Sequence, residues 1–460
     1  MSDKELVCTR REGMRLGDLT VAPYHRFTLG DRCMLINRET GSTLFLTAFA
    51  ADALERGEPD SRLRYQLVVN GFASVPGAPA LQCHVDTVMP TFFLIDMTNR
   101  CNLGCAYCLR VPTHLGKAIS KERLQDVCGY ILAHCRAHQL DRITIQPWGG
   151  EPLLELDRVL EIRRFFDQEP GIQVEITVET NGTLLTPEIL TQLREHRISI
   201  SVSLDGTPDV HDLQRRDRGG RPTSDRVREG ILAARAAGYR DLGGICVLTD
   251  HSIGRVQEIL DYCEHELGMG GVKLNLMRQP AYPCEGVRAL DDEEIQAMSA
   301  EIVEAVETLI ARGSRLKESG VLDRLHNLLS RSESNICHSC GCCGGLRMVS
   351  FDMDGLIYPC ELTDWADECL GSIYSGADLC DMVRAAIPKK AYFRQKHKTE
   401  CDDCPWWYYC RGGCSSAVKY LSQQGTAAVD ECECTLNRSM YPLLAALLLR
   451  RGAELKGWMS

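Results

Sequence analysis

The sequence lacks the features that carry a chain into or across a membrane. Its N-terminal stretch, MSDKELVCTRREGMRLG, has no apolar core of the kind that a secretion signal needs. The longest apolar run, YPLLAALLL at residues 441–449, is too short to span a bilayer and is followed by Arg450 and Arg451. We therefore expect a cytoplasmic protein without a membrane partner, in which residues 441–460 form a packed terminal helix.

A long basic run is also absent, and the net charge is −11. These two properties argue against nucleic acid as the partner of this protein. The 460 residues are 44% hydrophobic and 25% charged, which is typical of a soluble globular protein. This length is enough for two or three domains, each with its own core.

Cysteine, by contrast, is abundant, with 24 residues. Reducing compartments do not favour disulfide frameworks, so clustered cysteines in a cytoplasmic protein point to metal binding. Three of them lie within the eight residues CNLGCAYC, from Cys101 to Cys108, and 13 lie between Cys337 and Cys434. The second concentration predicts a separate cysteine-built domain over residues 337–440.

Residues 1–90 predict a small α+β domain. The stretch RCMLINRETGSTLFLT, from Arg32 to Thr47, alternates apolar and polar residues around a turn and predicts a hairpin. AFAADALERG then predicts a helix, and the Gly/Pro-rich GFASVPGAPA predicts a linker. Such an element either caps the main domain or docks a peptide by adding a strand to a free sheet edge.

Residues 91–280 predict an α/β domain with a parallel sheet in a curved or barrel-like form. Six short apolar runs rich in β-branched residues alternate with stretches of helical period, the pattern of strands joined by crossover helices. The runs are TFFLIDM, RITIQPW, IQVEITVET, ISISVSL, LGGICVL and GVKLNLM. Residues 281–336 are strongly helical and are predicted to connect this domain to the cysteine-rich one.

Four polar or glycine-bearing turns follow successive predicted strands. CNLGCAYC follows the first, WGGEP the second, TNGT the third and DG the fourth. Because the carboxyl ends of parallel strands meet at one edge of a sheet, these turns outline a single site.

Within the first turn, Cys101, Cys105 and Cys108 offer three ligands, whereas a closed structural metal site takes four. A four-iron cluster held by three thiolates would keep one iron open to a substrate or cofactor. A zinc ion would have to recruit a distant fourth ligand, and cysteines that pack as small hydrophobes would bind nothing. The spacing alone leaves these three possibilities open.

The same turns carry a family resemblance. CNLGCAYC resembles the CxxxCxxC motif of radical S-adenosylmethionine (SAM) enzymes, WGGEP resembles their GGE motif for the methionyl amino group, and ETNGTLL and SVSLDG resemble their ribose and carboxylate turns. The resemblance covers residues 92–280 and implies a partial (β/α)6 barrel. The SAM-binding residues that it implies are Tyr107, Gly149, Gly150, Glu151, Thr180, Asn181, Ser203 and Asp205.

What this resemblance implies is a 4Fe–4S cluster on the three cysteines with SAM chelated at its open iron. One-electron cleavage of SAM then releases a 5′-deoxyadenosyl radical that abstracts hydrogen from the substrate. The longer stretch SLDGTPDVHDLQRR resembles the branch of the family that modifies peptides and proteins.

In the cysteine-rich region, CDDCPWWYYCRGGC reads C-x2-C-x5-C-x3-C, and CHSCGCCGG and CEC lie on either side of it. Alone, these segments could form zinc ribbons. Together they resemble the SPASM domain of radical SAM peptide maturases, which implies two auxiliary 4Fe–4S clusters. The first cluster would use Cys337, Cys343, Cys360 and Cys414, and the second Cys401, Cys404, Cys410 and Cys432. Cys340 and Cys342 compete with the first two, and Cys434 competes with Cys432.

Two further features of this region bear on function. Glu361 follows Cys360, in a position where sulfatase-maturating relatives carry an acidic residue, usually aspartate, that is thought to deprotonate the substrate. A surface or turn-capping carboxylate is the alternative reading. The aromatic residues of PWWYYC predict shielding of a cluster from water, with stacking on a peptide as the alternative.

The resemblance implies a maturase that crosslinks a ribosomally made precursor peptide through a thioether or carbon–carbon bond. The N-terminal domain would dock the precursor's leader, and a low-potential donor such as flavodoxin or ferredoxin would supply electrons. A sulfatase-type maturase that makes formylglycine is an alternative. An iron–sulfur electron carrier or scaffold is another, although it would not need the SAM turns.

Overall fold

The computed structural model describes residues 5–74, 87–110, 116–278, 284–330, 337, 341–363, 366–422 and 428–459. Cys340 and most of the predicted linker lie outside the described residues. Among the helices described, none is long and apolar enough to cross a membrane.

The N-terminal domain contains two small antiparallel sheets and two helices. The four-stranded sheet has the order β1-β4-β5-β6 and the other has the order β2-β3-β7. The predicted hairpin is confirmed, since β5 and β6 pair antiparallel, and the predicted helix is α1. The elements are β1 (Val7–Arg11), β2 (Met14–Leu16), β3 (Leu19–Val21), β4 (Tyr24–Leu29), β5 (Arg32–Asn37), β6 (Thr43–Thr47), α1 (Ala48–Glu55), α2 (Ser61–Val69) and β7 (Ala73–Ser74).

Both faces of β5, an inner strand of the four-stranded sheet, are buried. Successive side chains of a strand point to opposite faces, and on β5 Leu35 joins a small core with α1 and α2. Its neighbours Met34 and Ile36 join the main core of the molecule instead. The domain is therefore packed onto the rest of the chain.

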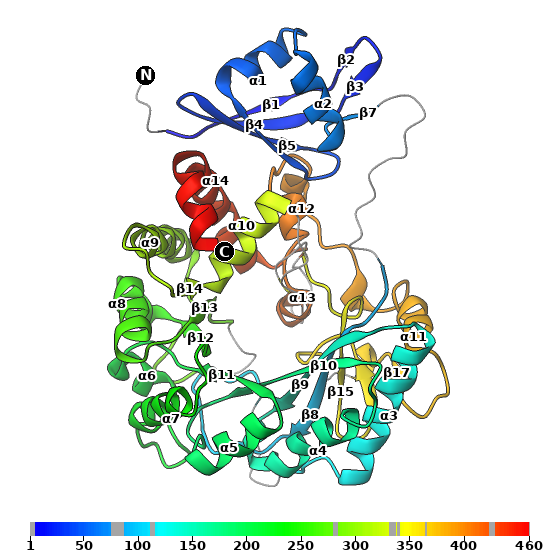
Figure 1. Cartoon of the computed structure of the whole chain (residues 1–460), viewed down its shortest axis with the longest axis vertical. Coiled ribbons are helices and arrows are strands. Elements are labelled where there is room, and N and C mark those ends of the chain that lie inside the picture. Colours follow the sequence, from blue (N-terminus) through cyan, green and yellow to red (C-terminus); the bar gives the residue numbers. More distant parts are fainter. Residues whose placement is uncertain are drawn as a thin grey trace.

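The main sheet has ten strands in the order β14-β13-β12-β11-β10-β9-β8-β15-β16-β17. From β8 to β13 the strands are parallel and adjacent in chain order, which confirms the partial barrel. Figure 1 shows this part of the sheet curving around the centre of the molecule. The six strands are β8 (Phe92–Thr98), β9 (Arg142–Gly149), β10 (Gln173–Thr180), β11 (Ile198–Ser203), β12 (Gly243–Leu248) and β13 (Gly271–Leu276).

Helices cover the outer face of these strands (Figure 1). Local sequence fixes their starts: Ser120 accepts from the Arg123 amide at the N-terminus of α3, and Thr186 does the same for Ile189 in α5. The helices are α3 (Lys121–Ala137), α4 (Leu156–Phe166), α5 (Pro187–Glu195), α6 (Pro208–Gln214), α7 (Ser224–Ala236) and α8 (Val256–Asp261).

The predicted helical connector contributes a strand to the main sheet. It consists of α9 (Asp292–Ala311), β14 (Lys317–Glu318) and α10 (Ser319–Ser330). Asp291 and Glu294 form a reciprocal capping box that starts α9. Because β14 pairs parallel with β13, this segment extends the barrel rather than only linking two domains.

The cysteine-rich region is also joined to the barrel sheet, because β15 pairs parallel with β8. A prediction of a separate cysteine-built domain therefore misses a continuous sheet between the two regions. The elements are β15 (Met348–Phe351), β16 (Leu356–Tyr358), β17 (Gly371–Ser372), α11 (Leu379–Ala386), α12 (Trp407–Cys410) and α13 (Ser415–Ser422).

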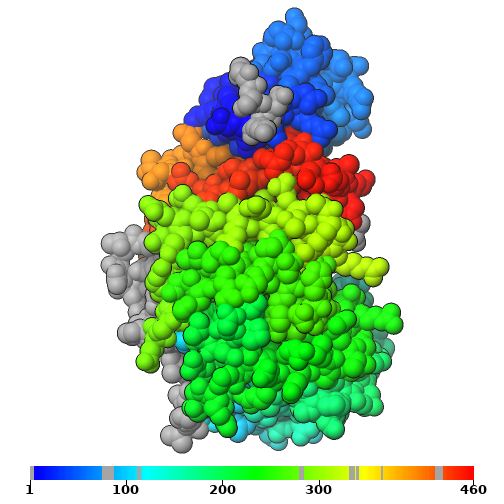
Figure 2. Space-filling model, turned by 90° about the vertical axis from the view of Figure 1, so that its left-hand side faces the viewer, coloured from blue at the N-terminus to red at the C-terminus, as the bar shows by residue number. Residues whose placement is uncertain are grey.

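The last helix, α14 (Glu431–Met459), begins ten residues before the predicted terminal helix at 441 and contains Pro442. It lies between the N-terminal domain and α9, and Figure 2 shows the four layers stacked in that order down to the barrel. The Arg32 guanidinium on β5 donates to the Leu449 carbonyl at 2.9 Å. The N-terminal domain therefore packs on α14.

The PWWYYC aromatics occupy the same junction. The Trp406 ring stacks on Tyr441 of α14, with centroids 5.3 Å apart, and lies 4.9 Å from the Phe27 ring of β4. The Tyr409 hydroxyl donates to the Gly41 carbonyl at 2.6 Å. These side chains join the N-terminal sheet to the cysteine-rich region, a role that the sequence pattern did not reveal.

Candidate active site

A cavity of about 820 Å³ lies where the carboxyl ends of the barrel strands face the cysteine-rich region. We call it the central cavity. Its walls come from the loops after β8, β9, β10 and β11 and from the segments around residues 337–362. The predicted site residues that line it are Cys101, Cys105, Tyr107, Cys108, Gly149, Gly150, Glu151, Thr180, Asn181, Ser203, Cys337, Cys343 and Glu361.

The three thiols of the first motif are not in disulfides and line one wall of the central cavity. Burial raises the pKa of the Cys105 thiol to about 11, and the Arg215 guanidinium, whose Nη1 lies 3.8 Å from that sulfur, acts in the opposite direction. Thiolate is the form that binds metal. Three thiols on one loop, with a cation beside them, fit the donor set that an iron–sulfur cluster with one open iron requires.

Two glycines of the WGGEP turn let the cysteine loop pack directly against β9. A Cβ at Gly150 would lie 2.2 Å from the Arg100 carbonyl oxygen, and one at Gly149 would lie 2.2 Å from the Thr98 carbonyl oxygen. The Gly149 φ of +133° also disfavours any residue with a side chain. The glycines therefore permit contact between two backbone segments as well as access to the cavity.

Glu151 ties the turns after β9 and β10 together. One carboxylate oxygen accepts from the Thr180 hydroxyl at 2.8 Å and from the Leu153 amide at 3.1 Å. The other oxygen accepts from the Asn181 amide at 2.8 Å. Burial raises the pKa of Glu151, while these donors act in the opposite direction. The side chain is thus fixed in place on the cavity wall.

Asn181 connects the same turn to the cysteine loop. Its amide nitrogen donates to the Asn102 side-chain oxygen at 2.8 Å and lies 3.9 Å from the Cys101 sulfur. Its oxygen accepts from the Thr183 amide and hydroxyl. Three predicted turns therefore share one hydrogen-bond network around the motif cysteines.

Asp205 lies behind the cavity wall, although the sequence places it among the ligand-binding residues. It is completely buried and accepts from the Tyr107 hydroxyl at 2.5 Å, from Arg215 Nε at 2.9 Å and from the Val247 amide at 3.0 Å. Burial raises the pKa of the Tyr107 phenol well above its ordinary value, so this group remains a donor. Asp205 positions Tyr107 and Arg215, and only those two face the cavity.

Arg215 is a site residue that sequence analysis did not single out. It lies within the stretch SLDGTPDVHDLQRR, at the end of α6, and its guanidinium lies 5.5 Å from the centre of the Tyr107 ring. One arginine of an adjacent pair carries no pattern that would distinguish it. Its partner Asp205 lies ten residues earlier, and this separation does not reveal that the two side chains pair.

Two acidic groups, Glu179 and Glu361, also line the central cavity. Glu361 is half-buried there, and its buried Oε2 has no hydrogen-bond partner among the described residues. Burial raises the pKa of Glu361. Burial together with the charge of Glu361 raises the pKa of Glu179, on β10, to about 7, with Gln146 and Lys273 acting in the opposite direction. Glu179, which the sequence analysis left without a role, is therefore electrostatically coupled to Glu361.

The first predicted group of C-terminal thiols gathers beside Glu361. Burial raises the pKa of Cys360 well above its ordinary value, and the charges of Glu361, Cys342 and Cys414 raise it further. Cys337 interacts with Cys342 and Cys414 in the same way. The Cys342 sulfur also lies 3.1 Å from the Tyr392 hydroxyl. Cys342 thus lies in this group, while Cys343 lines the central cavity.

In the second group, Cys434 is an electrostatic neighbour of Cys404 and Cys410. The charges of Cys434 and Cys401 raise the pKa of Cys404, and Cys434 also contributes to raising that of Cys410, although burial is the largest cause in both. Two residues apart on α14, side chains point to nearly opposite faces. Cys432 accordingly faces Arg278, Asp430 and Asp292.

A buried ion-pair network joins the cavity to this region. Arg278, which follows β13 and lines the central cavity, pairs with Asp430 at 2.5 Å and with Glu433 at 3.2 Å. The Arg324 guanidinium on α10 donates to the other Glu433 oxygen at 2.9 Å. Breaking a buried pair costs roughly 3–5 kcal/mol, so this network fixes α14 against the barrel.

Comparisons with known proteins agree with this site. Residues 95–263 match the model of the radical SAM superfamily. The mycofactocin maturase MftC of Mycobacterium ulcerans (strain Agy99) is 26% identical over 345 residues, which cover 73% of this chain and 86% of that protein. The cysteine-type anaerobic sulfatase-maturating enzyme of Clostridium perfringens (strain 13 / Type A) is 24% identical over 353 residues, covering 71% and 89%.

Solved structures share the fold. Native anSMEcpe with bound AdoMet aligns with a TM-score of 0.66 at 20% identity, over 78% of this chain and 99% of that one. Streptococcus suis SuiB bound to the precursor peptide SuiA aligns with a TM-score of 0.52 at 15% identity, over 86% and 94%. The superfamily match and the motif residues around one cavity lead to one conclusion: this chain contains a radical SAM domain over residues 95–263.

Proposed function

We propose that this enzyme matures a ribosomally made precursor peptide by installing an intramolecular thioether or carbon–carbon crosslink. SAM bound at the cluster supplies the 5′-deoxyadenosyl radical that takes a hydrogen atom from the peptide. The observation that carries the proposal is Glu361, a half-buried carboxylate that lines the same cavity as the three motif cysteines and has one buried oxygen without a partner among the described residues. A crosslinking maturase needs a carboxylate of this kind to remove a proton from the substrate.

Loss of a hydrogen atom alone does not complete a new bond. A proton and an electron must also leave the substrate, so that the net change is a loss of two hydrogens. Glu361 can accept the proton at Oε2. The adjacent Cys360 thiol belongs to the first C-terminal thiol group, which offers the ligands for an electron acceptor next to that base.

We further propose the ligands of three 4Fe–4S clusters. Cys101, Cys105 and Cys108 would hold the SAM-binding cluster. The first auxiliary cluster would use Cys337, Cys360 and Cys414 with either Cys342 or Cys343, and the second would use Cys401, Cys404, Cys410 and Cys434. The electrostatic neighbours of Cys434 favour it over Cys432.

The N-terminal domain would bind the precursor's leader at strand β6. This strand is an edge of the four-stranded sheet, so its outer backbone groups are available for strand addition. Beside it lies an apolar cavity of about 730 Å³, lined by Phe45 and Leu46 of β6 and by Leu329 and Leu448 of two helices. Replacing Phe45 with alanine should weaken precursor binding about tenfold, as measured by fluorescence anisotropy, because an apolar anchor is removed. Replacing Tyr65, which is exposed on α2, should not.

The decisive experiment uses protein purified and reconstituted without oxygen. It is given SAM, a strong reductant or a flavodoxin or ferredoxin donor, and a candidate precursor peptide encoded beside it, and the peptide is followed by tandem mass spectrometry. A mass loss of two hydrogens, with fragmentation suppressed between two residues, supports the proposal and locates the bond. Deoxyadenosine with an unchanged peptide would contradict the substrate assignment while leaving the SAM site intact.

A sulfatase-type maturase is the second candidate. It is favoured by the acidic residue after Cys360 and by the similarity to a sulfatase-maturating enzyme. Its product would be a carbonyl-reactive formylglycine at a single serine or cysteine of the substrate. The same mass spectrum distinguishes this outcome from a crosslink. An electron carrier or scaffold would form no deoxyadenosine in either assay.

A further inference from the structure

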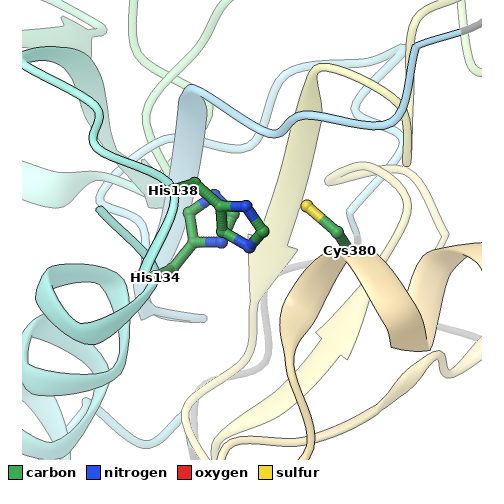
Figure 3. A group of neighbouring side chains, drawn as sticks. All are labelled: His134, His138 and Cys380. Carbon is green, nitrogen blue, oxygen red and sulfur yellow. The ribbon is translucent and has the colours of Figure 1, made fainter. Parts of the chain in front are cut away.

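A second group of metal-ligating side chains lies outside the central cavity. His134 and His138 are one turn apart on α3, and Cys380 lies on the first turn of α11. One ligand atom from each residue lies within 4.8 Å of the others. Figure 3 shows the Cys380 sulfur pointing toward the two imidazole rings, whose centres are 4.8 Å apart. The residues that line the central cavity include none of the three.

Nε2 of each histidine makes a hydrogen bond, and this bond determines whether Nδ1 is available as a ligand. His134 Nε2 lies 2.9 Å from the Pro90 carbonyl oxygen, and His138 Nε2 lies 2.8 Å from an Asp378 carboxylate oxygen. A carbonyl and an ionised carboxylate can only accept, so Nε2 is the donor in both rings, and in the neutral imidazole Nδ1 then carries the lone pair. A carbonyl or a carboxylate behind the imidazole is the arrangement that orients metal-binding histidines.

His134 supplies an independent sign of a missing ligand. The residue is only 4% exposed, and its Nδ1 is buried without a hydrogen-bond partner among the described residues. Buried polar atoms almost always have a partner. Cys380 is fully buried as well, and burial raises the pKa of its thiol to about 11, with Asp378 acting in the same direction. A bound cation would satisfy the nitrogen and favour the thiolate.

We propose that His134, His138 and Cys380 bind one zinc ion that clamps the barrel helix α3 to α11 of the cysteine-rich region. Two imidazole nitrogens and one thiolate suit zinc and not magnesium or calcium, which prefer oxygen ligands. Three protein ligands leave one position of a tetrahedron, which water can fill because His138 is only partly buried. The ion acts as a structural link and takes no part in SAM chemistry.

The test uses the full-length protein with its iron–sulfur clusters reconstituted, dialysed against zinc sulfate and then freed of excess metal. Zinc per chain is measured by mass spectrometry, and its ligands by zinc-edge X-ray absorption, which the iron does not obscure. We expect one zinc ion with one sulfur at about 2.3 Å and nitrogen or oxygen ligands at about 2.0–2.1 Å. Cys380→Ala and His138→Ala should each lose most of this zinc.

Two variants keep the test independent of folding. Cys135→Ala removes another buried cysteine of α3, between the two histidines, and should retain the zinc. Asp378→Asn should weaken zinc affinity about 10- to 100-fold, because it removes the carboxylate that orients His138. No bound zinc, a four-sulfur zinc shell, or zinc unchanged in both ligand variants would overturn the proposal. None of these readouts depends on the peptide substrate.

Discussion

The two cysteine-bearing regions of this molecule hold their thiols in different ways. In the barrel, three thiols come from eight consecutive residues, and hydrogen bonds that Asn181 donates to Glu151 and to the Cys101 sulfur brace the loops around them. In the C-terminal region, each thiol group draws on distant segments that tertiary packing brings together, such as Cys404 with Cys434 of α14. Three thiols from one short loop can leave one iron of a cluster open, whereas thiols gathered from several segments can supply all four ligands.

The largest expected effect comes from removing one of the three cysteines of the first motif. Cys105→Ala removes one of three thiols on the cavity wall and should lower deoxyadenosine formation by at least about a thousandfold, or about 4 kcal/mol of barrier. Chromatography of reduced enzyme with SAM measures it. Cys8→Ala, an exposed cysteine of β1, is the control and should retain full activity. Equal rates in the two variants would contradict the assignment of the first motif.

The next largest expected effect distinguishes proton removal by Glu361 from SAM cleavage at the cysteine loop. Glu361→Gln should reduce crosslinked peptide by about 10²–10⁴-fold, because the proton acceptor is lost, while deoxyadenosine still forms. Burial raises the pKa of Glu361, so its basic form appears only as the pH rises through that raised value. Product per deoxyadenosine should therefore increase with pH in the wild type and stay low and flat in the variant.

A control for that experiment is Glu175→Gln, which changes an exposed glutamate of β10. It should leave both products unchanged. If Glu361→Gln abolished deoxyadenosine and crosslink equally, Glu361 would belong to the binding of SAM rather than to proton removal.

A third test sharpens the comparison within the C-terminal region. Cys434→Ala should lose about four iron atoms per reconstituted chain, the content of one 4Fe–4S cluster, since its thiol lies with Cys404 and Cys410. Cys432→Ala should keep them, because Cys432 faces Arg278. Iron analysis and Mössbauer spectroscopy give the measurement. The reverse result would restore Cys432 as the ligand.

The smallest expected effect concerns the packing that supports the cysteine loop. A Cβ at Gly150 would lie 2.2 Å from the Arg100 carbonyl oxygen, so Gly150→Ala should destabilise the protein by about 1–3 kcal/mol through overpacking. Denaturant unfolding with the clusters intact measures the change. At Gly171, no atom lies within 4 Å of an added Cβ, and Gly171→Ala should be close to neutral.

Most of the barrel could be predicted from the sequence, because each strand is a local run of β-branched residues. All six predicted strands are present, within two residues of their predicted limits. The cysteine loop and the turns beside it were also predictable, since each is a short contiguous motif. Elements that are determined by neighbouring residues along the chain can be predicted, because those residues form a pattern in the sequence.

Contacts between distant segments left no such pattern. Asp205 was predicted to face the ligand, yet it pairs with Tyr107 and Arg215 behind the wall. Trp406 was predicted to shield a cluster, and the sequence did not reveal that it also packs on Phe27 and Tyr441. The choice between Cys432 and Cys434 depended on which face α14 presents, and periodicity within the helix does not reveal its neighbours.

The position of α14 has a consequence for how the protein is made. The N-terminal sheet is synthesised about 400 residues before α14, yet it needs this helix to cover one of its faces, because Met34 and Ile36 join a core that includes Tyr441 and Leu444. Domains usually fold in the order of synthesis. Here the nascent N-terminal sheet exposes an apolar face until α14 has been synthesised, so a chain truncated before residue 431 should aggregate or bind chaperones even though its barrel is whole.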